Sequence, residues 1–343
     1  MNKRKLHALI AAAALATAAG SVFAAKVDVY GVIDASLRHT TNEQAPAAAK
    51  ASKTAIGSGL SQSRIGFRAS EDLGGGLKAF ARLEHRLDAD SGTVAADAVN
   101  NGAGFWAESA VGIQSKLGTV SVGRQSGVLY DLYRPRNHAF QPLTEFTLAP
   151  RSDNLIKYAG NFGNFTVAAQ YGADENAGGR TVGATAAYRF GDVTAKVGTL
   201  TLQDDAGLKA DAHAVGLDYV KGPLRLAAAY LKNDFDAGFN GTFLYADANG
   251  NYGVPTAGDG REAYMLGGSY RFGRVTVGAQ YVRANLEGAD GKADFTSAVV
   301  SYALSKRTSI YGEVDVSKFD GALALPNGAD ERVGYMIGLR HSF

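Results

Sequence analysis

Apolar and polar residues alternate along most of the chain after residue 25. In residues 163–172 every second position is apolar: Phe165, Val167, Ala169 and Tyr171. The segments 274–282 and 331–343 repeat this alternation. A period of two is that of a β-strand with one apolar and one polar face. Strands of about 9–12 residues are also long enough to cross a bilayer at a tilt, so the pattern is compatible with membrane-spanning strands.

A tight turn centred on glycine recurs between these strands. Its clearest copies are Tyr188-Arg-Phe-Gly-Asp-Val-Thr and Tyr270-Arg-Phe-Gly-Arg-Val-Thr, and others begin near residues 71, 115, 160, 219 and 305. Glycine suits such turns because it adopts positive φ at little cost. Longer polar stretches separate the hairpins, at residues 40–60, 89–104, 126–153, 234–260 and 320–330. Seven hairpins with one further strand at each end predict sixteen strands, with short turns at one rim and long loops at the other.

A water-soluble β-sandwich or β-helix with buried aromatics is the alternative to a membrane barrel. In water, sixteen strands that are polar on the inner face and apolar on the outer face could not bury their apolar faces in a common core. Tyrosines also gather near the expected strand ends, where membrane barrels carry aromatic girdles. They are Tyr30, Tyr158, Tyr171, Tyr188, Tyr219, Tyr230, Tyr270, Tyr281 and Tyr302. The pattern therefore favours an all-β fold, a 16-stranded antiparallel transmembrane β-barrel.

The first 24 residues have the features of a secretory signal peptide. Lys3, Arg4 and Lys5 form a basic start, an apolar stretch follows, and Ala24 ends a Val-Phe-Ala motif suited to cleavage. The alternative is an N-terminal anchor that stays on the protein. We expect cleavage after Ala24, which leaves residues 25–343 as a single barrel domain.

Composition removes several classes of chemistry. The chain has no cysteine, which excludes disulfide scaffolds, iron–sulfur clusters and cysteine nucleophiles. Its formal net charge of +2 is close to neutral, whereas nucleic-acid-binding proteins usually carry a large excess of Lys and Arg. The six histidines show no metal-ligand spacing, and no nucleophile has an adjacent base. We therefore expect no cofactor, no metal, no nucleic-acid partner and no enzymatic activity, although barrel-shaped outer-membrane hydrolases keep an enzyme as a remote alternative.

Several segments occur together, in order, in one family. They are Val29-Tyr-Gly-Val-Ile-Asp-Ala, Ser63-Arg-Ile-Gly-Phe-Arg-Ala-Ser-Glu-Asp-Leu-Gly-Gly-Gly-Leu-Lys-Ala, Leu117-Gly-Thr-Val-Ser-Val-Gly-Arg-Gln, Asn154-Leu-Ile-Lys-Tyr, Tyr302-Ala-Leu-Ser-Lys-Arg-Thr and Gly338-Leu-Arg-His-Ser-Phe. On these residues the chain resembles the trimeric general porins of Gram-negative outer membranes, most closely the neisserial and burkholderial type. The resemblance implies a homotrimer in the outer membrane, surrounded by lipid and lipopolysaccharide, that passes small hydrophilic solutes and ions. It also implies that Phe343 is the signal read by the barrel-assembly machinery.

The resemblance further implies a third long loop, here 126–153, that folds inward and narrows the pore. In this family an arginine cluster lines the opposite wall, and its members correspond to Arg64 and Arg151. The loop carries the charged candidates Asp131, Arg134, Arg136 and Glu145. The sequence departs from the family at Phe105-Trp-Ala-Glu-Ser, which lacks an arginine found in relatives.

Strand parity identifies the cations of the lumen independently. A Lys or Arg facing lipid at the midplane costs about 2–4 kcal/mol, so mid-strand cations opposite an apolar face point inward. The resulting candidates for the pore wall are Arg38, Arg64, Arg68, Lys78, Arg82, Arg86, Arg151 and Lys157. We expect this wall to face Asp131 and Glu145 across the pore. Because wall cations outnumber wall carboxylates, we expect a passive porin with weak anion selectivity; an adhesin or receptor that uses the long loops is the alternative.

Overall fold

The computed structural model describes residues 26–43, 51–94, 105, 107–133, 148, 150–173, 179–239, 260–323 and 329–343. The expected signal peptide lies outside these ranges, as does most of the loop 126–153. The strands are β1 (Lys26–Glu43), β2 (Ala51–Ser58), β3 (Ser63–Gly74), β4 (Leu77–Leu87), β5 (Glu108–Ser115), β6 (Gly118–Ser126), β7 (Arg151–Phe162), β8 (Phe165–Gly172), β9 (Arg180–Phe190), β10 (Val193–Gln203), β11 (Lys209–Lys221), β12 (Leu224–Phe235), β13 (Gly260–Phe272), β14 (Val275–Glu287), β15 (Gly291–Ala303), β16 (Thr308–Gly321) and β17 (Glu331–Ser342). One short helix, α2 (Val128–Tyr133), follows β6.

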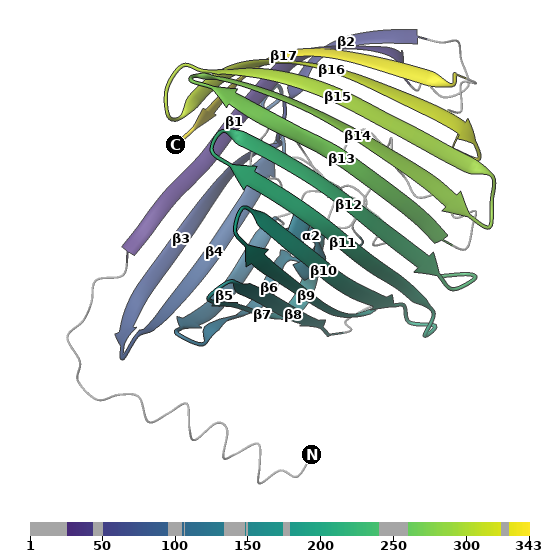
Figure 1. Ribbon diagram of the computed structural model, residues 1–343. Coiled ribbons are helices and arrows are strands. Elements are labelled where there is room, and N and C mark those ends of the chain that lie inside the picture. Colours follow the sequence, from purple (N-terminus) through teal and green to yellow (C-terminus); the bar gives the residue numbers. More distant parts are fainter. Residues whose placement is uncertain are drawn as a thin grey trace.

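These strands form one antiparallel sheet that closes into a tilted barrel (Figure 1). Each strand from β3 to β16 pairs with the next strand along the chain, and β1 closes the sheet by pairing with β17 on one side and with β2 and β3 on the other. The described residues contain 17 strands in this sheet, but β2 and β3 pair one after the other with β1. They therefore form a single crossing, and the barrel has the expected sixteen crossings.

The short turns lie where the glycine pattern predicts them. Gly163, Gly191, Gly222 and Gly273 each have φ between 56° and 62°, which is the left-handed region that hairpin turns require. The long connection expected at 40–60 is different, since β1 continues to Glu43 and β2 begins at Ala51. The sequence missed β2 because its polar and small residues resemble those of a loop.

Side chains alternate between a wet interior and an apolar exterior, as in every barrel of this kind. Along β1, Val29, Ile33 and Leu37 are 55%, 40% and 50% exposed on the outer face, whereas Asp34 is buried on the inner face. Tyr30 shares the inner face with Asp34, so its assignment to an aromatic girdle was wrong. Within the described ranges, no helix has the length and hydropathy needed to cross a membrane.

Candidate functional site

Five cations line the inner faces of β3 and β4. The pairing of these strands sets Arg64 directly opposite Arg86 and Arg68 directly opposite Arg82. Lys78 lies on the same face of β4 and is directly opposite Asp72 of β3. Directly opposed side chains lie about 4.5–5.5 Å apart at Cβ, and like charges in such pairs destabilise a sheet. We call this group the basic ladder; its cost to folding makes it a candidate for function rather than for stability.

Glu84 lies inside the basic ladder and is 6% exposed. Its carboxylate is 3.9 Å from Nε of Arg64 and 3.9 Å from Nε of Arg86. The Tyr30 hydroxyl donates a hydrogen bond to the same carboxylate at 3.0 Å. Glu84 therefore separates the two opposed guanidinium groups and offsets part of their charge.

Arg68, Lys78 and Arg82 are the exposed members of the ladder. The guanidinium of Arg68 lies 3.9 Å above the ring centre of Tyr30, and that of Arg82 lies 5.0 Å from the ring of Phe80. Arg82 also stands 3.4 Å from Glu108, with 47% of its side chain exposed. An aromatic ring holds a guanidinium in place without cancelling its charge, so these residues present positive charge to the lumen.

Arg38 lies on the inner face as expected, but its charge is already paired. Its Nη2 donates to both carboxylate oxygens of Asp315 on β16, at 2.6 and 2.8 Å. Its Nε donates to Thr40 at 3.2 Å. The expectation that Arg38 adds surplus charge to the pore wall was wrong, because Asp315 is 277 residues away in sequence and only barrel closure brings it near.

The described part of the third loop lies inside the barrel, as the family resemblance implies. The helix α2 packs against the inner faces of β8, β9 and β10. Its Leu129 and Tyr133 are 0% and 2% exposed. Three inward glycines leave room for it: Gly183, Gly198 and Gly216. A Cβ at Gly198 would lie 2.7 Å from Leu129 Cδ1, so the wall admits the helix only where side chains are absent.

Polar contacts fix both ends of α2. The backbone N–H of Val128 donates to Oε1 of Gln170 at 2.6 Å. Near the other end, Lys196 lies 5.6 Å from the ring of Tyr133 and 2.5 Å from Asp218. Burial raises the pKa of the Tyr133 hydroxyl, and the charge of Asp218 adds to the rise. The hydroxyl is therefore neutral at every physiological pH.

Asp131 of α2 has two partners close to it in the chain and on β7. It accepts a hydrogen bond from Lys157 at 2.9 Å and another from the Ser126 hydroxyl at 2.6 Å. Lys157 also donates to the Ser126 carbonyl at 2.8 Å. Asp131 thus pairs with one cation of the expected wall, Lys157, and this pair seats the helix; the expected field between Asp131 and the other wall cations stays a prediction. Arg134, Arg136 and Glu145 lie outside the described residues, so their places in the pore stay predictions.

Arg151 and Lys157 do not share a face of β7, contrary to the parity prediction. Asn154 has φ 51°, and the pairing with β6 shifts register opposite Arg124. This bulge reverses parity between the two residues. Nε of Arg151 donates to the Ala107 carbonyl at 3.1 Å, and its guanidinium lies 5.5 Å from the ring of Tyr130. Arg151 therefore belongs to the rim around α2 rather than to the basic ladder.

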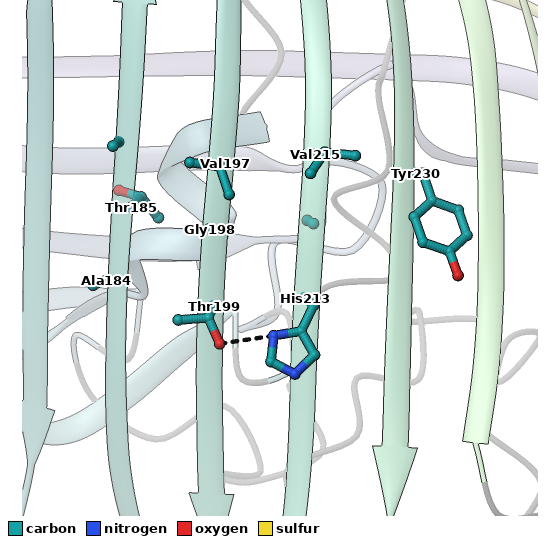
Figure 2. A pocket seen from close by; sticks show the side chains of 10 residues that line it. Ala184, Thr185, Val197, Gly198, Thr199, His213, Val215 and Tyr230 are labelled. Atoms are coloured by element: carbon teal, nitrogen blue, oxygen red, sulfur yellow. Dashed lines mark hydrogen bonds between the residues drawn. The ribbon is translucent and has the colours of Figure 1, made fainter.

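The outer wall behind α2 carries a shallow hollow of about 380 Å³ (Figure 2). Small and apolar residues of β9, β10 and β11 line it, and Tyr230 of β12 stands at one side. His213 and Thr199 lie in it as a hydrogen-bonded pair, 3.0 Å apart. The hollow opens away from the lumen, and His213 lies on the outer face with Val215.

Sequence reasoning missed the inward glycines, Tyr30 in the lumen and the contacts of Arg38. Inward parity of Gly183, Gly198 and Gly216 within otherwise regular strands was a usable signal for a loop seated against the wall. Among the described residues there is no group of three or more His, Asp or Glu that could hold a metal ion.

Comparison with known proteins adds to this geometry. A family model described as Gram-negative porin matches residues 11–322. Outer membrane porin protein 32 of Delftia acidovorans is 29% identical over 374 residues, which cover 98% of this chain and 99% of that protein. Major outer membrane protein P.IB of Neisseria meningitidis serogroup B is 26% identical, over 93% of this chain and 95% of its own length. The solved anion-selective porin from Comamonas acidovorans superposes with a TM-score of 0.76 at 26% identity, covering 93% of this chain and 100% of that one.

Proposed function

Since the chain belongs to the Gram-negative porin family, we propose that it is an outer-membrane channel for passive diffusion of small hydrophilic solutes and ions, with a weak preference for anions. Its relatives are outer-membrane channel proteins rather than enzymes. The outer membrane is therefore its location.

The basic ladder is the observation that carries the anion preference. Arg64, Arg68, Lys78, Arg82 and Arg86 share one wet wall. Glu84 and Glu108 form ion pairs with this group, and Asp28 and Asp72 lie directly opposite Arg68 and Lys78. Fixed positive charge in a water-filled pore attracts anions and repels cations. The similar Comamonas porin is itself described as anion-selective, which supports the same assignment for this chain.

Current recordings in planar lipid bilayers test this function. We expect the purified protein to insert as stepwise increases in current and to give a reversal potential in a KCl gradient that favours chloride. Stepwise current with a clear potassium preference would contradict the selectivity but leave the channel intact. A protein that assembles but carries no current would contradict the channel function itself.

We also propose a homotrimer that meets through the first strands and the last. Small outward residues on these strands, Ala35, Ala79 and Ala81, permit close approach between barrels. The solved OmpT of Vibrio cholerae in its trimer form shares this fold, with a TM-score of 0.68 at 18% identity. Native mass spectrometry in detergent should find three copies, and a monomer alone would contradict the proposal.

Two further partners belong to the same proposal. Lipopolysaccharide is expected around the outer face, where Arg283, Lys292 and Lys318 stand near the loop ends of β14, β15 and β16. The barrel-assembly machinery is expected to read Phe343. That residue exchanges two backbone hydrogen bonds of 3.1 Å with Gly31, so the last residue takes part in barrel closure.

A further inference from the structure

The connection between β2 and β3 contains more residues than the sheet can hold. Ser58 pairs with Ala35 of β1, and pairing resumes at Arg64 with Val32. Two residues of β1 therefore stand opposite five residues, 59–63, of the other strand. The surplus cannot lie flat in the ladder, so part of this segment must leave the wall.

The surplus residues, Gly59–Gln62, fold into the lumen. The N–H of Leu60 donates to the Tyr311 hydroxyl at 3.2 Å, and the N–H of Ser61 donates to Asp34 at 3.0 Å. Both acceptors lie on the inner face. Tyr311 belongs to β16, which β1 and β17 separate from β2 and β3. The Tyr311 ring lies over Gly338 of β17, where a Cβ would lie 2.2 Å from its Cζ, so the tyrosine side chain crosses β17 and meets the segment above β1.

A buried pair holds this segment in place. Asp34 is 0% exposed and Tyr311 is 3% exposed, and the tyrosine hydroxyl donates to the carboxylate. A Cβ on Gly59 would lie 1.7 Å from the Tyr311 hydroxyl and 2.0 Å from Asp34 Oδ1. Leu60, 6% exposed, joins an apolar cluster with Tyr311. We call the Asp34–Tyr311 pair the latch.

The same segment contacts the basic ladder. The Gln62 carbonyl accepts a hydrogen bond from Nη1 of Arg64 at 3.2 Å. The Gln62 side-chain oxygen accepts another from Nη1 of Arg86, also at 3.2 Å. These two arginines are directly opposite each other across β3 and β4. One residue of the segment thus bridges two guanidinium groups that repel each other.

We propose that Gly59–Gln62 is a second constriction element of the channel, separate from the third loop, and that Gln62 positions Arg64 and Arg86 toward the ion path while the latch holds the segment. This inference rests on the proposed channel function. It makes Tyr311 a positioning residue for selectivity although Tyr311 belongs to β16, on the far side of β1 and β17 from the ladder.

Tyr311→Phe tests the latch, because it removes the hydroxyl that joins Asp34 to Leu60 and leaves the ring. We expect a larger single-channel conductance, and a chloride-over-potassium permeability ratio that falls by roughly two-fold as the arginines lose their alignment. Tyr302→Phe, on the outer face of β15, is the matched control and should change neither. If Tyr311→Phe assembles as the wild type does and both quantities stay unchanged, the latch has no role in the channel.

The absence of cysteine from the chain permits a second test that keeps both Asp34 and Tyr311. In Ser61→Cys, the single thiol should react with a negatively charged methanethiosulfonate, and the reaction should lower both the conductance and the chloride preference. Ile56→Cys, on the lipid face of β2 and 63% exposed as isoleucine, is the control whose modification should leave the current unchanged. A Ser61→Cys channel that resists labelling, or that conducts identically once labelled, would overturn the inference. Absence of current in every variant and in the wild type would instead contradict the channel function.

Discussion

Replacing Arg68 by glutamine should weaken the anion preference without altering the barrel. Arg68 is an exposed member of the basic ladder, and it is held by the Tyr30 ring at 3.9 Å, a contact that leaves its charge intact. Glutamine keeps a polar, shorter and uncharged side chain at the same inward position. The change therefore removes one unit of fixed charge from the wall and little else.

The size of the effect follows from Coulomb's law with screening. An ion about 7 Å from the guanidinium interacts with it by about 0.6 kcal/mol in water, which a Debye length of about 8 Å reduces to about 0.25 kcal/mol. The sign is opposite for chloride and potassium, so removal of the charge changes their relative energies by about 0.5 kcal/mol. Because about 1.4 kcal/mol corresponds to a factor of ten, the permeability ratio should fall by roughly two-fold.

Reversal potentials at two salt concentrations provide the assay. At about 1 M salt the Debye length is about 3 Å, so the effect of Arg68→Gln should nearly vanish there. Arg180→Gln is the matched control, because Arg180 lies on the outer face and donates to Gln203 at 2.6 Å. An unchanged ratio at low salt would refute the assignment of Arg68 to the ion path. A shift that persists at high salt would show that the substitution acts through structure rather than charge.

Three other substitutions test neighbouring parts of the site. Glu84→Gln should raise the chloride-over-potassium ratio by roughly two-fold, since it removes the carboxylate that offsets the ladder, and a fall in that ratio would contradict the reasoning. Gly198→Val should displace α2, because even a Cβ there would lie 2.7 Å from Leu129 Cδ1, and single-channel conductance should change while Val197→Ala on the outer face has no effect. Deletion of Phe343 should lower the amount of protein in the outer membrane but not the conductance of each assembled channel; equal outer-membrane levels on immunoblots would refute its role as an assembly signal.

Local sequence patterns were enough to predict the sixteen crossings and the short turns that join them. The period-two pattern and the glycine turns are local properties, so every crossing could be recognised within its own dozen residues, whereas β2, with the composition of a loop, could not. Parity then placed Arg64, Arg68, Lys78, Arg82 and Arg86 on one face, because β3 and β4 carry no irregularity between these positions. The basic ladder was therefore predictable without knowing what lies around it.

Contacts between distant segments set which of those charges pair with a carboxylate and which elements narrow the lumen. A single bulge at Asn154 separated Arg151 from Lys157, since one extra residue reverses every parity beyond it. Arg38 met Asp315 only because β1 closes the barrel near β16 and β17. The inward fold of Gly59–Gln62 likewise depends on a partner from β16. Alternation along one strand carries no information about contacts made across the lumen or through closure, and these contacts set the electrostatics of the pore.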